Sequence, residues 1–267
     1  MSILHDVPFD DYVKIDAINW SKLKHMDESP LSYRHHATAP DRDTPSRLLG
    51  RLAHSLTLEP GASDDVVVWE GGDRRGKAWQ AFAAANEGRT IVKPGEIDSA
   101  REMAAAVRGH PLVAPYLPGA QFEVTTTWTD HATGLKCKAR QDWMRTDTLI
   151  DMKTTTTINS LRFTSQAEKL GYFGQLAHYR AGLVACGHPV ARVLIVAVES
   201  KAPYDVGVFE VSEMSLGSAS VEVADMLARL SACLKADTWP GRYETEQPLI
   251  RPDWALGGDL TFTPDED

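Results

Sequence analysis

The chain has 267 residues, of which 43% are hydrophobic, and its formal net charge at pH 7 is −9. This size and composition are typical of one large or two small globular domains with an ordinary buried core. No apolar run reaches the roughly 18 residues that a membrane-spanning helix needs. The acidic N-terminus has no secretory pattern, and Cys137, Cys186 and Cys233 lack zinc or disulfide spacing. We therefore expect a protein of the reducing cytoplasm.

Positive charge is concentrated between residues 132 and 170. This stretch has seven Lys and Arg against four Asp and Glu, which gives +3 and leaves −12 for the rest of the chain. A basic region within an acidic body suits an enzyme that must release DNA and move along it. It does not suit a protein that coats DNA.

The first 118 residues are predicted to be mostly helical. Short helices are expected over residues 17–24, capped by Asn19 or Ser21, and from Ser29, where Pro30 fits the first turn. Residues 38–46 read as a loop, and residues 47–58 repeat leucine at helical spacing around His54. Residues 66–69 are β-like, residues 78–86 and 93–108 are helical, and residues 111–116 form a helical turn.

Residues 71–77 match the pattern G-x-x-x-x-G-K of phosphate-binding loops, but Ala78 replaces the hydroxyl that would hold Mg²⁺. An NTPase is therefore kept only as an alternative. We interpret the stretch as a basic surface loop in which Arg74, Arg75 and Lys77 contact DNA phosphates.

The sheet is predicted to contain strands at residues 121–129, 135–144 and 148–154, the last two joined by a turn at residues 145–147. If this turn centres on Thr146 and Asp147, Asp142 lies across from Asp151, with Cβ atoms about 5 Å apart. Lys153 then shares the face of Asp151, and Met152 points into the core.

Two carboxylates and one amine at one place are hard to explain by packing. Carboxylates at this distance repel, and a hard divalent cation such as Mg²⁺ relieves the repulsion. The lysine can orient a water or neutralise charge on a phosphate. Glu123, on the neighbouring strand, is either a further metal ligand or a solvent-facing acid. A second acid-x-Lys match, at residues 199–201, has Val190 instead of an upstream acid and no hairpin turn.

The remaining elements follow from periodicity. Residues 160–170 are helical or irregular, residues 171–184 form a helix with Gln175 and Tyr179 on one face, and residues 192–198 and 206–211 are strands. A long helix covers residues 214–235, and residues 251–267 are an irregular tail. We predict one domain: a helical part (1–118), a catalytic sheet with the Gln175/Tyr179 helix (119–212), and a C-terminal helix and tail (213–267).

These motifs together resemble the RecB-type branch of the PD-(D/E)XK nucleases, and more closely the nuclease domain of RecE (exonuclease VIII) and its phage relatives. The resemblance covers more than 200 residues. Its motifs lie at residues 18–23 with Ser29-Pro30, 50–60, 133–143, 151–155, 174–179, 199–204 and 239–241.

The resemblance implies an α/β fold with a restriction-endonuclease-like core, in which helices flank a central mixed β-sheet and the N-terminal extension is helical. It implies a Mg²⁺-dependent exonuclease, with Mn²⁺ as a substitute, that digests linear double-stranded DNA from the 5′ end and leaves 3′ overhangs. The implied partners are DNA ends, a RecT-type single-strand annealing protein, and further copies of the chain in a trimeric or tetrameric ring. A phage or prophage protein in a bacterial cytoplasm fits this description.

Carried over residue by residue, the resemblance makes Asp142 and Asp151 the Mg²⁺ carboxylates, with the Met152 carbonyl as a further ligand. Lys153 becomes the catalytic lysine, and His54 the helix histidine near the metal. Gln175 and Tyr179 support the site and contact the nucleic-acid strand. We also expect Lys138 and Arg140, on the strand that leads to Asp142, to contact DNA. The chain departs from its relatives at Gln141, where they tend to have Pro, and in having Asp rather than Glu at position 151.

Two other classes of function remain open at this stage. One is a PD-(D/E)XK nuclease of different polarity or with a single-stranded substrate. The other is a catalytically silent module that binds DNA ends.

Overall fold

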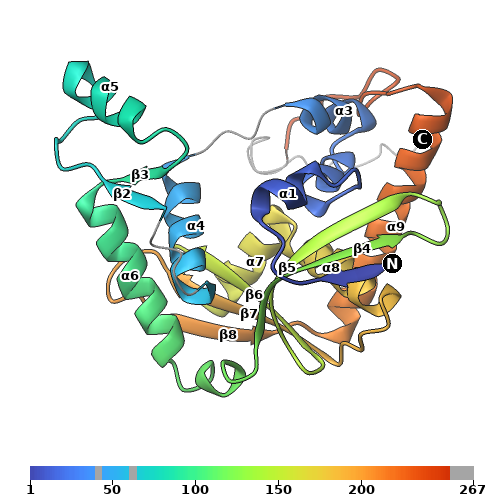
Figure 1. The fold of residues 1–267 in the computed structure, drawn as a ribbon. Helices are drawn as coiled ribbons and strands as arrows, with labels where there is room; N and C mark the ends of the chain where they lie inside the picture. Colours follow the sequence, from blue (N-terminus) through green and yellow to red (C-terminus); the bar gives the residue numbers. More distant parts are fainter. Residues whose placement is uncertain (40–43, 60–64, 253–267) are drawn as a thin grey trace, which may run out of the picture.

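The computed structural model describes residues 1–39, 44–59 and 65–252 (Figure 1). Parts of the predicted 38–46 loop and most of the predicted tail lie outside these residues. The strands are β1 (Ser2–Leu4), β2 (Val66–Val68), β3 (Thr90–Val92), β4 (Gln121–Thr129), β5 (Lys136–Arg145), β6 (Thr148–Thr155), β7 (Arg192–Glu199) and β8 (Val206–Glu210). The α-helices are α1 (Phe9–Lys14), α2 (Trp20–Leu23), α3 (Pro30–Thr38), α4 (Pro45–Leu58), α5 (Gly76–Ala85), α6 (Pro94–Gly109), α7 (Ser160–Leu170), α8 (Tyr172–Ala185) and α9 (Glu213–Ala236). Short 3₁₀ segments cover Lys24–Met26 and Ala114–Tyr116.

The described strands form a mixed sheet in the order β1-β4-β5-β6-β7-β8 and a small parallel pair, β2-β3. Within the large sheet only β6 and β7 are parallel, because α7 and α8 connect them as a crossover. All other neighbouring strands are antiparallel. This confirms the predicted α/β fold with a central mixed sheet.

Helices cover both faces of the sheet (Figure 1). One apolar cluster joins α4 and α6 to β5, β6 and β7, with Trp143 and Ile150 fully buried in it. A second joins α7 and α8 to the other face, around Leu149 and Ile195. A third packs α2 and α9 near Trp128. None of the described helices has both the length and the apolar character needed to cross a membrane.

Most predicted elements begin and end within one or two residues of their expected bounds, but the helix predicted over residues 17–24 begins at Trp20, and the helical turn predicted over residues 111–116 begins at Ala114. Asn19 caps α2 and Ser29 caps α3, each through a side-chain oxygen that accepts a backbone N–H. The short strands β1 and β3 were not predicted, and α1, which lies in the part predicted to be mostly helical, was not predicted as a separate helix. The two strands have three residues each and depend on distant partners, since Ser2 pairs with Thr127 and Thr90 pairs with Val66.

The hairpin of β5 and β6 has the predicted register, but it pairs over a shorter length than predicted. Trp143, Met144 and Arg145 pair with Ile150, Leu149 and Thr148, and the pairing ends there. The expected direct pair of Asp142 with Asp151 is therefore not formed. The two strands separate at this point, and the space between them is filled by polar side chains.

Strand β4 is irregular at the same level. Glu123 has a φ of 52°, and Glu123 and the opposite Asp142 are the two positions missing from the middle of the β4–β5 ladder. Phe122 and Val124, on either side of it, pack in clusters on opposite faces of the sheet. The usual alternation of side chains is thus interrupted where Glu123 and Asp142 meet. Backbone strain such as the positive φ of Glu123 is concentrated at functional sites.

Close helix packing behind the site depends on a glycine in α8. A Cβ built on Gly174 would lie 2.1 Å from Cη2 of Trp20, which is far inside van der Waals contact. Gly174 thus allows Trp20 of α2 to pack directly against α8, next to Gln175.

We predict that Gly174→Ala lowers the free energy of unfolding by about 1–3 kcal/mol, because the added methyl group forces Trp20 or α8 to move. Gly217→Ala, in α9, is the matched control, since a Cβ there meets nothing within 4 Å. It should stabilise the protein by up to about 1 kcal/mol through helix propensity. Urea unfolding of both variants measures the difference, and equal effects of the two substitutions would contradict the packing argument.

A fully buried histidine, His178, lies on α8 beneath β4 and β5. Its Nε2 is 3.1 Å from the Lys138 carbonyl oxygen, and its Nδ1 is buried without a hydrogen-bond partner. The ring centroid is 4.8 Å from that of Trp128. Burial lowers the pKa of His178 to about 4, although the hydrogen bond to Lys138 partly opposes this shift. The folded protein therefore keeps this ring neutral.

This pKa predicts a loss of stability in mild acid. The unfolded chain takes up the proton below pH of about 6.5, whereas the folded chain does so only near pH 4, so stability falls as pH decreases through this interval. The shift corresponds to about 3 kcal/mol. Unfolding free energies of wild type and His178→Gln, measured by denaturant titration between pH 7 and 4, should differ in slope. Parallel curves would show that His178 does not cause the loss.

Candidate active site

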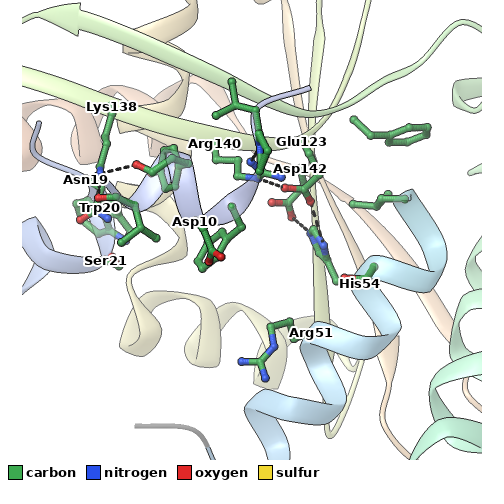
Figure 2. A pocket seen from close by; sticks show the side chains of 18 of the residues that line it. Asp10, Asn19, Trp20, Ser21, Arg51, His54, Glu123, Lys138, Arg140 and Asp142 are labelled. Atoms are coloured by element: carbon green, nitrogen blue, oxygen red, sulfur yellow. Dashed lines mark hydrogen bonds and ion pairs between the residues drawn. The ribbon is translucent and has the colours of Figure 1, made fainter. Parts of the chain in front are cut away.

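A cleft of about 1830 Å³ lies between the N-terminal segment, α4, α8 and the strands β4 and β5 (Figure 2). Its lining includes His54, Glu123, Asp142, Gln175 and Tyr179, which come from four different elements. Asp151 and Lys153 of β6 lie against this group, in contact with Gln175 and with each other. The structure thus brings together all the residues that the sequence predicted to be catalytic.

Helix α4 places His54 between two carboxylates. Its Nδ1 is 3.2 Å from Glu123 Oε1, and its Nε2 is 2.9 Å from Asp142 Oδ2. Burial alone would lower the pKa of His54, but Asp142 and Glu123 outweigh it and raise this pKa to about 9. Gly50, one turn earlier, allows the approach, because a Cβ there would lie 2.9 Å from Thr154 Oγ1 on β6.

Asp142 occupies the point where β5 leaves β6. Its Oδ2 accepts a hydrogen bond of 2.9 Å from the Met152 backbone amide, so the side chain replaces the missing ladder contact. Burial opposes its charge, yet the neighbouring His54 and Lys153, together with this amide, lower the pKa of Asp142. Asp142 is therefore held as a carboxylate.

Asp151 is fully buried, and Lys153 contacts it directly. The distance from Lys153 Nζ to Asp151 Oδ2 is 2.5 Å, and Gln175 Nε2 donates to Asp151 Oδ1 at 3.2 Å. Burial raises the pKa of Asp151, and Lys153 only partly offsets this. For Lys153, burial lowers the pKa, but Asp151 and Asp142 outweigh it and raise it. The lysine is consequently an ammonium, and its Nζ lies 4.8 Å from the centroid of the Tyr172 ring.

Arg140 is the charge partner of Glu123. Its Nε donates to Glu123 Oε2, and its Nη1 donates to the Val7 carbonyl oxygen. Burial raises the pKa of Glu123, while His54 and Arg140 lower it. The cluster therefore contains three carboxylates, and each of them contacts a cationic side chain.

These residues fit a hard divalent cation. Ligand atoms of His54, Glu123 and Asp142 all lie within 4.8 Å of one another. Glu123 Oε1 and Asp151 Oδ2 are buried and receive no well-aligned hydrogen bond, although His54 and Lys153 lie within ion-pair distance. The carboxylate oxygens suit Mg²⁺ or Mn²⁺, whereas an imidazole is a ligand that transition metals accept more readily than Mg²⁺ does. The Met152 carbonyl stays a predicted ligand, and the Met152 side chain points into the core as expected.

The residues predicted to contact DNA are placed differently from the catalytic ones. Lys138 is only 4% exposed, and its ammonium donates to three backbone carbonyls, so the predicted phosphate contact does not fit this position. Arg140 lines the cleft but is bound to Glu123 and Val7. Arg74, Arg75 and Lys77 precede or begin α5, which projects beyond β2 and β3 (Figure 1), and they do not line the cleft. Arg74 is held there by Glu96 and the Ile91 carbonyl.

Sequence reasoning missed two parts of the site, the Tyr172 ring below Lys153 and the N-terminal segment that forms one wall. Tyr172 directly follows the left-handed Gly171 that starts α8, which is a signal for its position but not for its contact. The spacing of Lys138, Arg140 and Asp142 places all three on one face of the catalytic strand. Because two of them are cations that need partners, this spacing was a signal that another segment packs against that face.

Comparison with known proteins identifies the class of this fold. A crystal structure from Eubacterium rectale, described as a "Putative exonuclease", superimposes with a TM-score of 0.64 at 16% identity, covering 93% of this chain and 96% of that one. Residues 19–249 match the family model described as "PDDEXK-like domain of unknown function (DUF3799)". The chain belongs to this PDDEXK-like family and thus to the PD-(D/E)XK superfamily. Among curated proteins, no sequence matches it significantly.

If the acidic cluster binds a divalent cation, the cation should stabilise the fold, because a ligand that binds only the folded state shifts the unfolding equilibrium. We expect Mg²⁺, Mn²⁺ or the non-catalytic Ca²⁺ at a hundred times its Kd to add about 2.7 kcal/mol. Asp142→Asn should abolish this effect, whereas Asp225→Asn, on the exposed face of α9, should retain it. Thermal unfolding with cation or EDTA measures it, and equal stabilisation of both variants would place the cation elsewhere.

Proposed function

We propose that this protein is a Mg²⁺-dependent nuclease that hydrolyses phosphodiester bonds in DNA, with Mn²⁺ as a substitute metal. The observation that carries the proposal is the convergence of His54, Asp142, Asp151 and Lys153 at the end of one cleft. Structural ion pairs alone would not need a buried cluster of three carboxylates, which costs several kcal/mol per charge unless each is compensated. Membership of the PDDEXK-like family supports the same conclusion.

Asp142 and Asp151 would hold the metal, with Glu123 and the Met152 carbonyl as further ligands. His54 would join them only by releasing a proton, because an imidazole coordinates a metal in its neutral form. When bound, the metal would polarise the scissile phosphate and lower the pKa of a water. Lys153 lies beside Asp151, which together with Asp142 raises the pKa of the lysine and favours its ammonium form. Its role is to orient that water by donating a hydrogen bond and to stabilise negative charge on the phosphate.

Gln175 connects the buried and the exposed parts of the site. Its amide nitrogen donates one hydrogen to Asp151 Oδ1 and one to Tyr179 Oη, at 3.2 and 2.9 Å. Gln175 thus fixes the orientation of Asp151. Because the Tyr179 hydroxyl accepts this hydrogen bond within the cleft, it can donate its own proton to a phosphate oxygen of the bound strand.

The finer activity follows from the resemblance to RecE-type nucleases. We propose a 5′-to-3′ exonuclease on linear duplex DNA that leaves 3′ overhangs for a RecT-type annealing protein. The related fold of the Eubacterium rectale protein, whose description names an exonuclease, supports the exonucleolytic mode. A trimeric or tetrameric ring and a phage or prophage protein in the bacterial cytoplasm complete the proposal, and these points rest on the resemblance alone.

The decisive experiment uses linear duplex DNA labelled separately at its 5′ and 3′ ends, with Mg²⁺ or EDTA. We expect early, Mg²⁺-dependent release of the 5′ label. Lys153→Ala should slow this release by about 100-fold or more, because the charge that develops on the phosphate loses its stabilising partner.

Lys201→Ala is the matched control, since the chain repeats the acid-x-Lys pattern at Glu199 and Lys201. Lys201 is exposed, and Glu199 accepts a hydrogen bond from the Ile158 backbone amide instead of joining the site. This variant should cleave like wild type. Early release of the 3′ label would indicate the opposite polarity. DNA binding without release of either label would indicate a silent end-binding module and contradict the proposed activity.

A further inference from the structure

Residues 5–16 form one wall of the cleft and lie outside the part of the chain that the family model matches, which begins at residue 19. This N-terminal wall contains α1. It runs past Glu123 and Asp142, since Arg140 links Glu123 to the carbonyl of Val7 (Figure 2). The wall thus stands next to the candidate catalytic residues, in a part of the chain that the family model does not cover.

Two cations of β5 fasten the wall at both ends of α1. Lys138 Nζ donates to the carbonyl oxygens of Tyr12, Val13 and Ile15 at 2.8, 3.0 and 2.8 Å, which caps the C-terminal end of the helix. Arg140 holds the segment just before the helix, at Val7. Because Lys138 and Arg140 are buried on the strand that carries Asp142, the position of α1 is fixed relative to the site.

The first residue of α1 presents an aromatic ring to the cleft. Phe9 lines the cleft and is 62% exposed. Its ring is tilted by 33° from that of buried Tyr12, with centroids 6.2 Å apart, and Lys138 Nζ lies 4.7 Å from the centroid of Tyr12. A ring on a fixed helix loses little conformational entropy when a planar group stacks on it.

The charges of the cleft determine which part of a nucleic-acid strand can face Phe9. The acids of the N-terminal wall that line the cleft are Asp6, Asp10 and Asp16. Arg51 and His54 project from α4 toward the cleft on another side (Figure 2), where Glu59 also lines it, and Lys22 and Lys24 line it from the α2 region. Phosphates are repelled by the acidic wall and attracted by the cationic one. The acidic groups of the wall thus favour an uncharged base over a phosphate beside Phe9.

We propose that Phe9 is a specificity-determining residue that stacks on a base of the single DNA strand entering the site. Base–aromatic stacking tolerates any sequence and requires an unpaired, splayed base. It would therefore favour a frayed or single-stranded end over continuous duplex. This inference rests on the proposed nuclease function.

Binding can be measured without cleavage in the Lys153→Ala background with Ca²⁺. Fluorescence anisotropy of a labelled duplex with a short single-stranded end gives the Kd, and the same DNA with an abasic site at each end position locates the stacked base. Phe9→Ala should weaken binding by about 5- to 100-fold, the range expected for loss of one stacked base. Phe9→Trp should keep the affinity. Tyr243→Ala, an equally exposed aromatic outside the cleft, is the control and should bind unchanged.

Two readouts separate stacking from a general disturbance of the wall. One abasic position should weaken binding in the parent protein but not in Phe9→Ala, and the dependence of Kd on salt should stay the same, because Phe9 contacts no phosphate. Equal abasic effects in both proteins, or affinities within about twofold, would overturn the role of Phe9 while leaving the nuclease intact. Failure of every variant to bind DNA would overturn the proposed function as well.

Discussion

The site depends on burying three carboxylates close together. Glu123, Asp142 and Asp151 come from three successive strands of the sheet, and bringing them together costs free energy through both desolvation and repulsion. The protein offsets this cost by giving each carboxylate a cation: Arg140 for Glu123, His54 for Asp142 and Lys153 for Asp151. Burial still raises the pKa of Asp151, although Lys153 contacts this carboxylate and opposes the shift.

The sheet accommodates this cluster because regular strand pairing is lost at the position of Glu123 and Asp142. The β5–β6 ladder ends at the pair of Trp143 with Ile150, and the φ of Glu123 is positive. The Met152 backbone amide donates its hydrogen bond to the Asp142 side chain instead of to the backbone of β5. Helices from both faces then reach the same opening. Gly50 lets α4 bring His54 from one side, and Gly174 lets α8 bring Gln175 from the other. Tight packing behind the site holds these strained groups in position.

The N-terminal segment is held by the same strand that carries Asp142. Lys138 and Arg140 are spaced two residues apart on β5, so they and Asp142 point to the same side of the strand. Two of these side chains bind the segment that walls the cleft, and the third belongs to the acidic cluster. Strand β5 thereby couples the position of the wall to the geometry of the catalytic residues.

Local patterns were sufficient for the long elements and for most of the site. The turn at Thr146, the acid-x-Lys of β6 and the four-residue spacing of Gln175 and Tyr179 are set by neighbours in the chain, and the structure places them as predicted. The short strands β1 and β3, and the burial of Lys138, could not be predicted in this way. Their stability comes from partners that are distant in sequence, such as Thr127 for Ser2 and Tyr12 for Lys138.

The sequence by itself therefore determined the fold class, through its resemblance to a known family, and two acids of the cluster, Asp142 and Asp151, while Glu123 was left open. Only the tertiary structure decided how these residues meet, because the separation of β5 from β6 and the positive φ of Glu123 have no local signature. It also decided that Lys138 serves the fold and not the surface. The alternating pattern of the strand predicts an exposed lysine. In the structure its three ammonium hydrogens are donated to carbonyl oxygens of a segment more than a hundred residues earlier, which the sequence pattern does not indicate.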